Sequence, residues 1–114
     1  MGEGPSQASE LGRFAEPAML VLVSLSDGPK HGYAIMTDVE AFGGASLGPG
    51  TLYAVLARLE AGGLIEPLES DERRRPYRLT AAGAAALAGQ LAEMGRFLRI
   101  GRMRLRGATE GPDR

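Results

Sequence analysis

Residues Leu47–Thr80 read LGPGTLYAVLARLEAGGLIEPLESDERRRPYRLT, and this stretch decides the fold. Proline suits the first turn of a helix, so Pro49 marks the start of a short helix. The double glycine Gly62–Gly63 marks its end. Two short apolar segments, 64–69 and 76–80, then flank a loop that carries three arginines. A helix, a stop and a basic hairpin in this order are typical of a DNA-reading helix followed by a wing.

The helix that begins at Pro49 has two unlike faces. Its apolar residues recur at steps of three and four, which predicts one buried face formed by Leu52, Val55, Leu56 and Leu59. The other side is small or polar, and we expect it to enter the major groove of DNA, as recognition helices do. The residues on that side are Thr51, Tyr53, Ala54 and Arg58. The alternative is that Tyr53 packs under the wing and Arg58 is an ordinary solvated side chain.

The loop between the two predicted strands is strongly basic. Arg73, Arg74 and Arg75 stand at its tip, where they can clamp the phosphates or the minor groove beside the reading helix. Contacts of this kind fix the position of a protein on DNA and do not read sequence. Asp71 and Glu72 lie next to them, so the alternative is a surface loop of balanced charge.

Two further helices precede the reading helix. The first begins at Pro17 and continues through a nearly all-apolar segment, so it should lie buried. The second is expected over residues 30–42, with one apolar face and a glycine stop after it. Lys30, at its start, is interpreted either as a contact to the DNA backbone or as a free surface lysine.

The last segment predicts one long helix over residues 81–106, with Thr80 as its N-cap. Apolar residues follow a heptad seam, which comprises Ala84, Leu87, Leu91, Met94, Leu98, Gly101 and Leu105. A second apolar strip comprises Phe97, Ile100 and Met103. A lone helix on so small a body cannot bury both strips, so we expect it to pair with another copy of itself.

The predicted dimer seam could also enclose a ligand. The residues expected there are Leu87, Leu91, Met94, Phe97 and Leu98. Methionine adapts its shape, which suits a cavity for a small hydrophobic or aromatic effector. An ordinary packed interface without a cavity is the alternative.

These elements predict a mainly α fold with a small β-hairpin, divided into four parts. They are a disordered arm at 1–13, a winged helix-turn-helix domain at 14–80, a dimerisation helix at 81–106 and a disordered tail at 107–114.

Length and composition exclude several classes of function. The chain has 114 residues, a length that suits a single domain. Its net charge is −1, and it has no cysteine and one histidine. Thiolate and multi-histidine metal sites are therefore excluded, and we expect no cofactor. No catalytic arrangement stands out, so we do not expect an enzyme. The longest apolar run is far shorter than the ~20 residues of a membrane span, so we expect a cytoplasmic protein without a membrane partner.

Several motifs, at their spacings, resemble the PadR family of transcriptional regulators. They are HGYAI at 31–35, GPGTLY at 48–53, RLE at 58–60, GLI at 63–65 and YRLT at 77–80. The resemblance covers about residues 14–106, and the single last helix is similar to that of the short subfamily. It implies a winged helix-turn-helix, a two-fold homodimer joined through the last helix, and repression by binding to inverted repeats in double-stranded DNA.

The same resemblance implies roles for single residues. Thr51 and Tyr53 match a DNA-facing segment, Arg73–Arg75 match the basic wing, and Tyr33 would steady the helix-turn-helix and touch phosphate. Many members respond to small aromatic or cationic compounds, and some line the space between the last helices with tryptophan. This chain has no tryptophan, and Met94 falls near the equivalent place.

Two other classes stay open beside the DNA-binding regulator. A winged helix can act as a protein-interaction module without touching DNA, and the near-neutral net charge leaves room for this. The other class is a small-molecule-binding protein that does not bind DNA.

Overall fold

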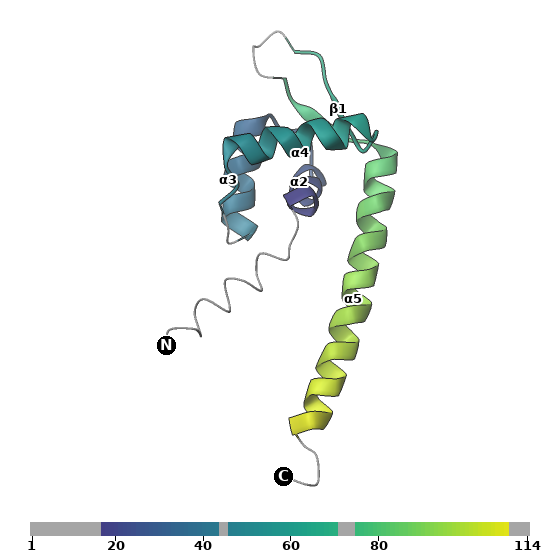
Figure 1. Ribbon diagram of the computed structural model, residues 1–114. Coiled ribbons are helices and arrows are strands. Elements are labelled where there is room, and N and C mark those ends of the chain that lie inside the picture. The colour runs from purple at the N-terminus through teal and green to yellow at the C-terminus, as the bar shows by residue number, and fades with distance from the viewer. Residues whose placement is uncertain (1–16, 44–45, 71–74, 110–114) are drawn as a thin grey trace.

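The computed structural model describes residues 17–43, 46–70 and 75–109. The elements in order are α2 (Pro17–Leu25), α3 (Gly32–Gly43), α4 (Pro49–Ala61), β1 (Ile65–Pro67), β2 (Tyr77–Leu79) and α5 (Ala81–Thr109). The hairpin stands above α4, and α5 extends away from the other helices for most of its length (Figure 1). The predicted class, a mainly helical winged fold with a long last helix, is confirmed.

The core lies where α2, α3 and α4 meet. Each helix contributes apolar residues from one side, and α2 contributes from most of its circumference because its sequence is almost entirely apolar. The most deeply buried of these residues are Val21, Ile35, Val39, Leu52 and Leu56. Burying each such side chain stabilises the fold by roughly 1.5–3 kcal/mol. This core fixes the orientation of α4, whose opposite face stays exposed.

Both ends of α4 follow from local sequence. Gly48 is its extended N-cap, with φ −68° and ψ 159°, and Pro49 occupies the first turn. At the other end Gly63 has φ +77°, a conformation that favours glycine. The amide of Gly63 donates to the Glu60 carbonyl at 3.0 Å, and that of Leu64 donates to the Leu59 carbonyl at 3.0 Å. This pair of bonds ends the helix and turns the chain into β1.

The wing is a short antiparallel hairpin with an additional bridge. β1 and β2 pair with Glu66 opposite Arg78, and these two side chains form an ion pair. Lys30, between α2 and α3, pairs with Tyr77 in an isolated antiparallel bridge on the other side of β2. Because Lys30 is taken up in this bridge, α3 starts at Gly32, two residues later than predicted.

The start of α5 is fastened to the turn after α4. The Thr80 hydroxyl accepts a hydrogen bond from the Gly83 amide at 3.0 Å, which confirms the predicted N-cap, and donates to the Gly63 carbonyl at 2.7 Å. Gly83 is buried against Leu64, and only glycine fits there: an added Cβ would lie 2.0 Å from the Leu64 carbonyl oxygen. Leu87, one turn further along the helix, reaches the core.

The end of α5 corrects one expectation. The helix continues to Thr109, so the predicted disordered tail is wrong for residues 107–109. Ala108 is a strong helix former, and the Thr109 hydroxyl donates to the Arg106 carbonyl at 3.0 Å in the last turn. The predicted arm at 1–13 and the rest of the tail, residues 110–114, lie outside the described residues.

Candidate nucleic-acid interface

The face of α4 opposite the core presents a small and polar surface. Thr51, Ala54 and Arg58 are exposed there, and Tyr53 is 55% exposed. Their neighbour Leu52 is fully buried, so the predicted division of this helix into two faces agrees with the structure. Gly48 is the N-cap of α4 and has no side chain, so no side chain of the N-cap residue accepts a hydrogen bond from the first turn. An exposed helix face of small and polar residues is suited to contact a nucleic-acid groove.

Tyr53 does not stand alone on this face. Its ring lies over Gly32, at the start of α3: a Cβ built on that glycine would be 2.7 Å from the tyrosine hydroxyl oxygen. The missing side chain at Gly32 therefore makes room for the phenol. The contact joins the predicted reading helix to the preceding helix, while about half of the surface of Tyr53 stays exposed.

Tyr77, on β2, occupies the partly buried space between the wing and α4. Burial raises the pKa of its phenol above the ordinary value of 10.0, and the nearby Glu60 carboxylate raises it further. The Arg75 guanidinium acts in the opposite direction. Tyr77 is therefore a neutral hydrogen-bonding group at physiological pH, and it lies among residues of both the wing and α4.

The described residues include only part of the basic wing. Arg75 is exposed at the point where the loop re-enters the described chain, whereas Arg73 and Arg74 lie outside the described residues. Arg78 is engaged by Glu66 across the hairpin, which reduces its availability to an external anion. Within the described part of the wing, Arg75 is thus the residue best placed to meet a phosphate.

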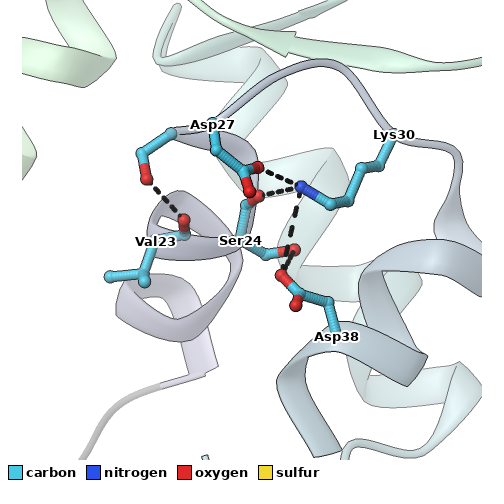
Figure 2. Close-up of polar contacts among 6 residues, drawn as sticks. Val23, Ser24, Asp27, Lys30 and Asp38 are labelled. Carbon is cyan, nitrogen blue, oxygen red and sulfur yellow. Dashed lines mark hydrogen bonds and ion pairs between the residues drawn. The ribbon is translucent and has the colours of Figure 1, made fainter. Parts of the chain in front are cut away.

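Lys30 is the predicted DNA contact that the structure does not support. Its side chain is only 19% exposed, and its ammonium donates to the Ser24 carbonyl and, at 2.5 Å, to Asp27 Oδ1 (Figure 2). Asp38 Oδ2 lies 4.0 Å away on α3. The ammonium is therefore engaged within its own chain, by a backbone carbonyl and by the exposed carboxylate of Asp27. These contacts contradict the interpretation of Lys30 as a free surface lysine, whereas its contact with the DNA backbone stays a prediction.

The start of α3 carries the predicted residue Tyr33, which is 62% exposed. His31 precedes it and caps the helix: its Nδ1 accepts a hydrogen bond from the Ala34 amide at 3.4 Å, and its carbonyl accepts one from Ile35 at 3.0 Å. The lone histidine is therefore structural, and Tyr33 is free to contact a molecule outside the chain.

The predicted dimer seam is largely open in the single chain. Its exposed residues include Leu91 at 48%, Met94 at 50%, Leu98 at 52% and Phe97 at 79%. Leu87 is different, because it is 6% exposed and belongs to the core of its own chain. Its assignment to the dimer seam or a ligand pocket is therefore corrected: Leu87 anchors α5 to the body, and the open apolar surface begins one turn later.

Sequence reasoning missed two features of this region, the glycine at 32 under Tyr53 and the polar contacts of Lys30. The second left a signal, since Ser24 is a buried polar residue in an otherwise apolar helix, and its hydroxyl donates to Asp38 Oδ2 at 2.8 Å. The first left none, because no local pattern tells which side chain will lie over a helical glycine. Among residues 17–43, 46–70 and 75–109, no cluster of metal-ligating side chains occurs, and no helix there has the length and apolar content to cross a membrane.

A family model described as the transcriptional regulator PadR-like family matches residues 21–89. The chain is 50% identical over 85 residues to an uncharacterized 37.1 kDa protein in transposon TN4556 of Streptomyces fradiae, and 41% identical over 70 residues to the transcriptional regulator Rv3488 of Mycobacterium tuberculosis. These matches cover 75% and 59% of this chain. The chain spans 25% of the first relative and 64% of the second.

Solved structures agree with the fold. A PadR family transcription regulator from Clostridium difficile R20291 matches with a TM-score of 0.71 and 27% identity, covering 77% of this chain and 96% of that one. One from Eggerthella lenta matches with a TM-score of 0.70 and 30% identity, covering 89% of both chains. A structure described as the complex of hsRosR-S1 matches with a TM-score of 0.63 and 26% identity, covering 86% of this chain and 96% of that one.

Proposed function

Because this chain belongs to the PadR-like family of transcriptional regulators, we propose that it binds an inverted-repeat operator in double-stranded DNA as a homodimer. The α4 face that carries Thr51, Tyr53 and Ala54 enters the major groove, and Arg58 contacts phosphate. The wing arginines Arg73–Arg75 clamp the flanking backbone. Such a protein works beside the chromosome, in the cytoplasm, and binding over a promoter represses transcription.

One observation carries this proposal: α4 exposes a small, polar face opposite the core, and the wing that follows it carries an exposed arginine. Thr51 and Ala54 keep the helix surface low enough for the groove, and Arg75 is exposed on the wing. Tyr33, on α3, adds a further exposed aromatic side chain. A helix in the groove with flanking phosphate contacts is the general arrangement of helix-turn-helix proteins, in which phosphate contacts position the helix and base contacts select the sequence.

The open apolar surface of α5 supports the homodimer. Leu91, Met94 and Leu98 lie on one side of a helix that the body of the protein does not cover. A second copy of the helix buries this seam, and the two α4 helices then lie about one duplex turn apart, roughly 34–36 Å. A small hydrophobic or aromatic effector bound beside Met94 or Phe97 changes the angle between the two winged helix-turn-helix domains of the dimer. This change alters the affinity for the operator.

The test measures binding of the full chain to a duplex from its own upstream promoter. Fluorescence anisotropy reports the binding at several salt concentrations. If two subunits neutralise about eight phosphates, log affinity falls against log salt with a slope near −7. Replacing Arg75 with alanine reduces the magnitude of this slope and weakens binding to all duplexes alike. Replacing Thr51 with valine instead lowers preference for the operator over unrelated DNA.

Two outcomes contradict the proposal. A chain that binds no duplex at low salt acts as an interaction module or a small-molecule-binding protein. Equal affinity for the promoter and for unrelated DNA, with footprinting that protects no defined bases, leaves a DNA-binding protein without an operator.

A further inference from the structure

The backbone of Lys30 holds one end of the wing. Its amide donates to the Tyr77 carbonyl at 3.1 Å, and the Tyr77 amide donates to the Lys30 carbonyl at 2.9 Å. Tyr77 is the first residue of β2, and Arg75 precedes it by two positions. The position of the wing arginine therefore depends on where this bridge lies.

The side chain of Lys30 holds the same residue to two helices. Its ammonium donates to the Ser24 carbonyl on α2 and to Asp27 Oδ1 in the turn after it, at 2.5 Å. Asp38 on α3 lies 4.0 Å from the ammonium and accepts a hydrogen bond from the Ser24 hydroxyl at 2.8 Å. Figure 2 shows these groups converging on one nitrogen from both helices. Lys30 thus links the wing strand β2 to the pair of helices that pack beneath α4.

The hairpin is also attached to the body at other points, and Ile65 of β1 is fully buried in the core. The base of the hairpin is fixed to α4 through the turn at Gly62–Gly63 and to α5 through Thr80. The pairing of β1 with β2 covers three residues on each strand, and the bond from the Leu68 amide to the Pro76 carbonyl, at 2.8 Å, extends it toward the tip. A short two-stranded hairpin is marginally stable on its own, so each attachment to the helices, the Lys30 bridge included, contributes to its position.

We infer that Lys30 is a positioning residue for DNA binding: it contacts no phosphate and instead holds the wing at a fixed angle to α4 through Tyr77. This inference rests on the proposed function. Lys30 is the only lysine in the chain, whose other basic residues are twelve arginines. A lysine suits this position better than an arginine, because an ammonium directs three donors at converging acceptors, whereas a guanidinium is planar.

The first test compares Lys30→Met with Arg75→Ala in the full chain. Methionine keeps the length of the stem and removes the ammonium. We expect Lys30→Met to weaken operator binding about tenfold, the effect of losing roughly one charge-assisted hydrogen bond. The slope of log affinity against log salt should stay that of the wild type, because no phosphate contact is lost. Arg75→Ala should reduce the magnitude of that slope by about 1.8 for a dimer, or about 0.9 per contact.

Two conservative variants distinguish the two interpretations of Lys30. If Lys30 contacts phosphate, Lys30→Arg should keep the affinity of the wild type. If the ammonium must fit between Ser24 and Asp27, Lys30→Arg should bind more weakly than the wild type. Asp38→Asn removes a negative charge, which by electrostatics alone strengthens binding to DNA. If Lys30 positions the wing, Asp38→Asn weakens binding instead.

Hydrogen exchange of the free protein tests the link without DNA. In Lys30→Met, the amides of Lys30 and Tyr77 should exchange faster than in the wild type, while the core amide of Leu52, bonded to the Gly48 carbonyl at 2.9 Å, should keep its rate. A purely global loss of stability would accelerate all three together.

The inference is overturned by any of five results: unchanged affinity of Lys30→Met, a reduced salt slope in that variant, full affinity of Lys30→Arg, stronger binding of Asp38→Asn, or uniform acceleration of exchange. A wild-type chain that binds no duplex contradicts the proposed function and removes the role of Lys30 at DNA with it. The exchange rates then still decide whether Lys30 holds the wing.

Discussion

At the scale of single residues, two glycines allow close contacts between elements because they have no side chain. Gly83 lets α5 start against the carbonyl of Leu64, and Gly32 lets the Tyr53 ring lie on α3. The two differ in what a new methyl group would meet. At Gly83 it meets backbone, which cannot move without the helix, and at Gly32 it meets the far end of a half-exposed side chain.

Gly83→Ala should therefore destabilise the fold. An added Cβ would lie 2.0 Å from the Leu64 oxygen and 2.8 Å from Leu79 Cδ1, so α5 must shift. We expect a loss of about 1–3 kcal/mol in the free energy of unfolding, measured by urea titration. Gly89→Ala is the matched control, since nothing lies within 4 Å of its site, and it should stabilise by up to about 1 kcal/mol. Equal stability of the two variants would contradict the packing at Leu64.

Asp27 provides a test of the Lys30 contacts by pH. A hydrogen bond from Lys30, and then its positive charge, hold the pKa of the Asp27 carboxyl below the ordinary 3.8. Because the folded-state pKa is lowered, the stability that this pair contributes is present above pH 3.8 and is lost as pH falls through the folded-state pKa. Carboxyl carbon shifts followed by NMR should show a midpoint below 3.8 in the wild type and an ordinary midpoint in Lys30→Met.

At the scale of elements, the sequence predicted the faces of helices better than the contacts between them. The spacing of Leu52, Val55 and Leu56 predicted the buried side of α4 because a helix repeats regularly. Thr80 was recognised as a cap because capping is local. The bridge between Lys30 and Tyr77 joins residues 47 positions apart, and no local pattern encodes such a pairing.

The contact between α3 and α4 at Gly32 leads to a prediction about these two elements. Gly32→Ala should leave the free energy of unfolding within about 1 kcal/mol of the wild type, since Tyr53 is half exposed and can rotate away. Operator affinity, measured by anisotropy, should fall, because the displaced tyrosine crowds the reading face. In a Tyr53→Ala background the same substitution should have no further effect on affinity. Additive losses would show that Gly32 acts by another route.

At the scale of the whole molecule, the chain combines a packed head with a helix that is covered only at its start. α5 has 29 residues, which is about 44 Å of helix, and only Gly83 and Leu87 in it are buried. Its sequence predicted the apolar seam but not where the body of the protein ends, because a heptad pattern does not distinguish a contact within the chain from one with a second copy. Leu87 was misassigned for this reason.

Leu91→Asp tests whether a second copy covers the open seam. Placing a carboxylate at the centre of an apolar interface costs several kcal/mol unless the charge is paired, so the variant should be a monomer in light scattering where the wild type is a dimer. Affinity for a two-site operator should then fall by on the order of 100-fold, while affinity for a single half-site changes little. Ala92→Asp, with the same new charge on the neighbouring exposed residue, lies off the seam and should remain a dimer. A dimeric Leu91→Asp protein would mean that the subunits meet elsewhere, and a monomeric wild type with full operator affinity would mean that one head is enough.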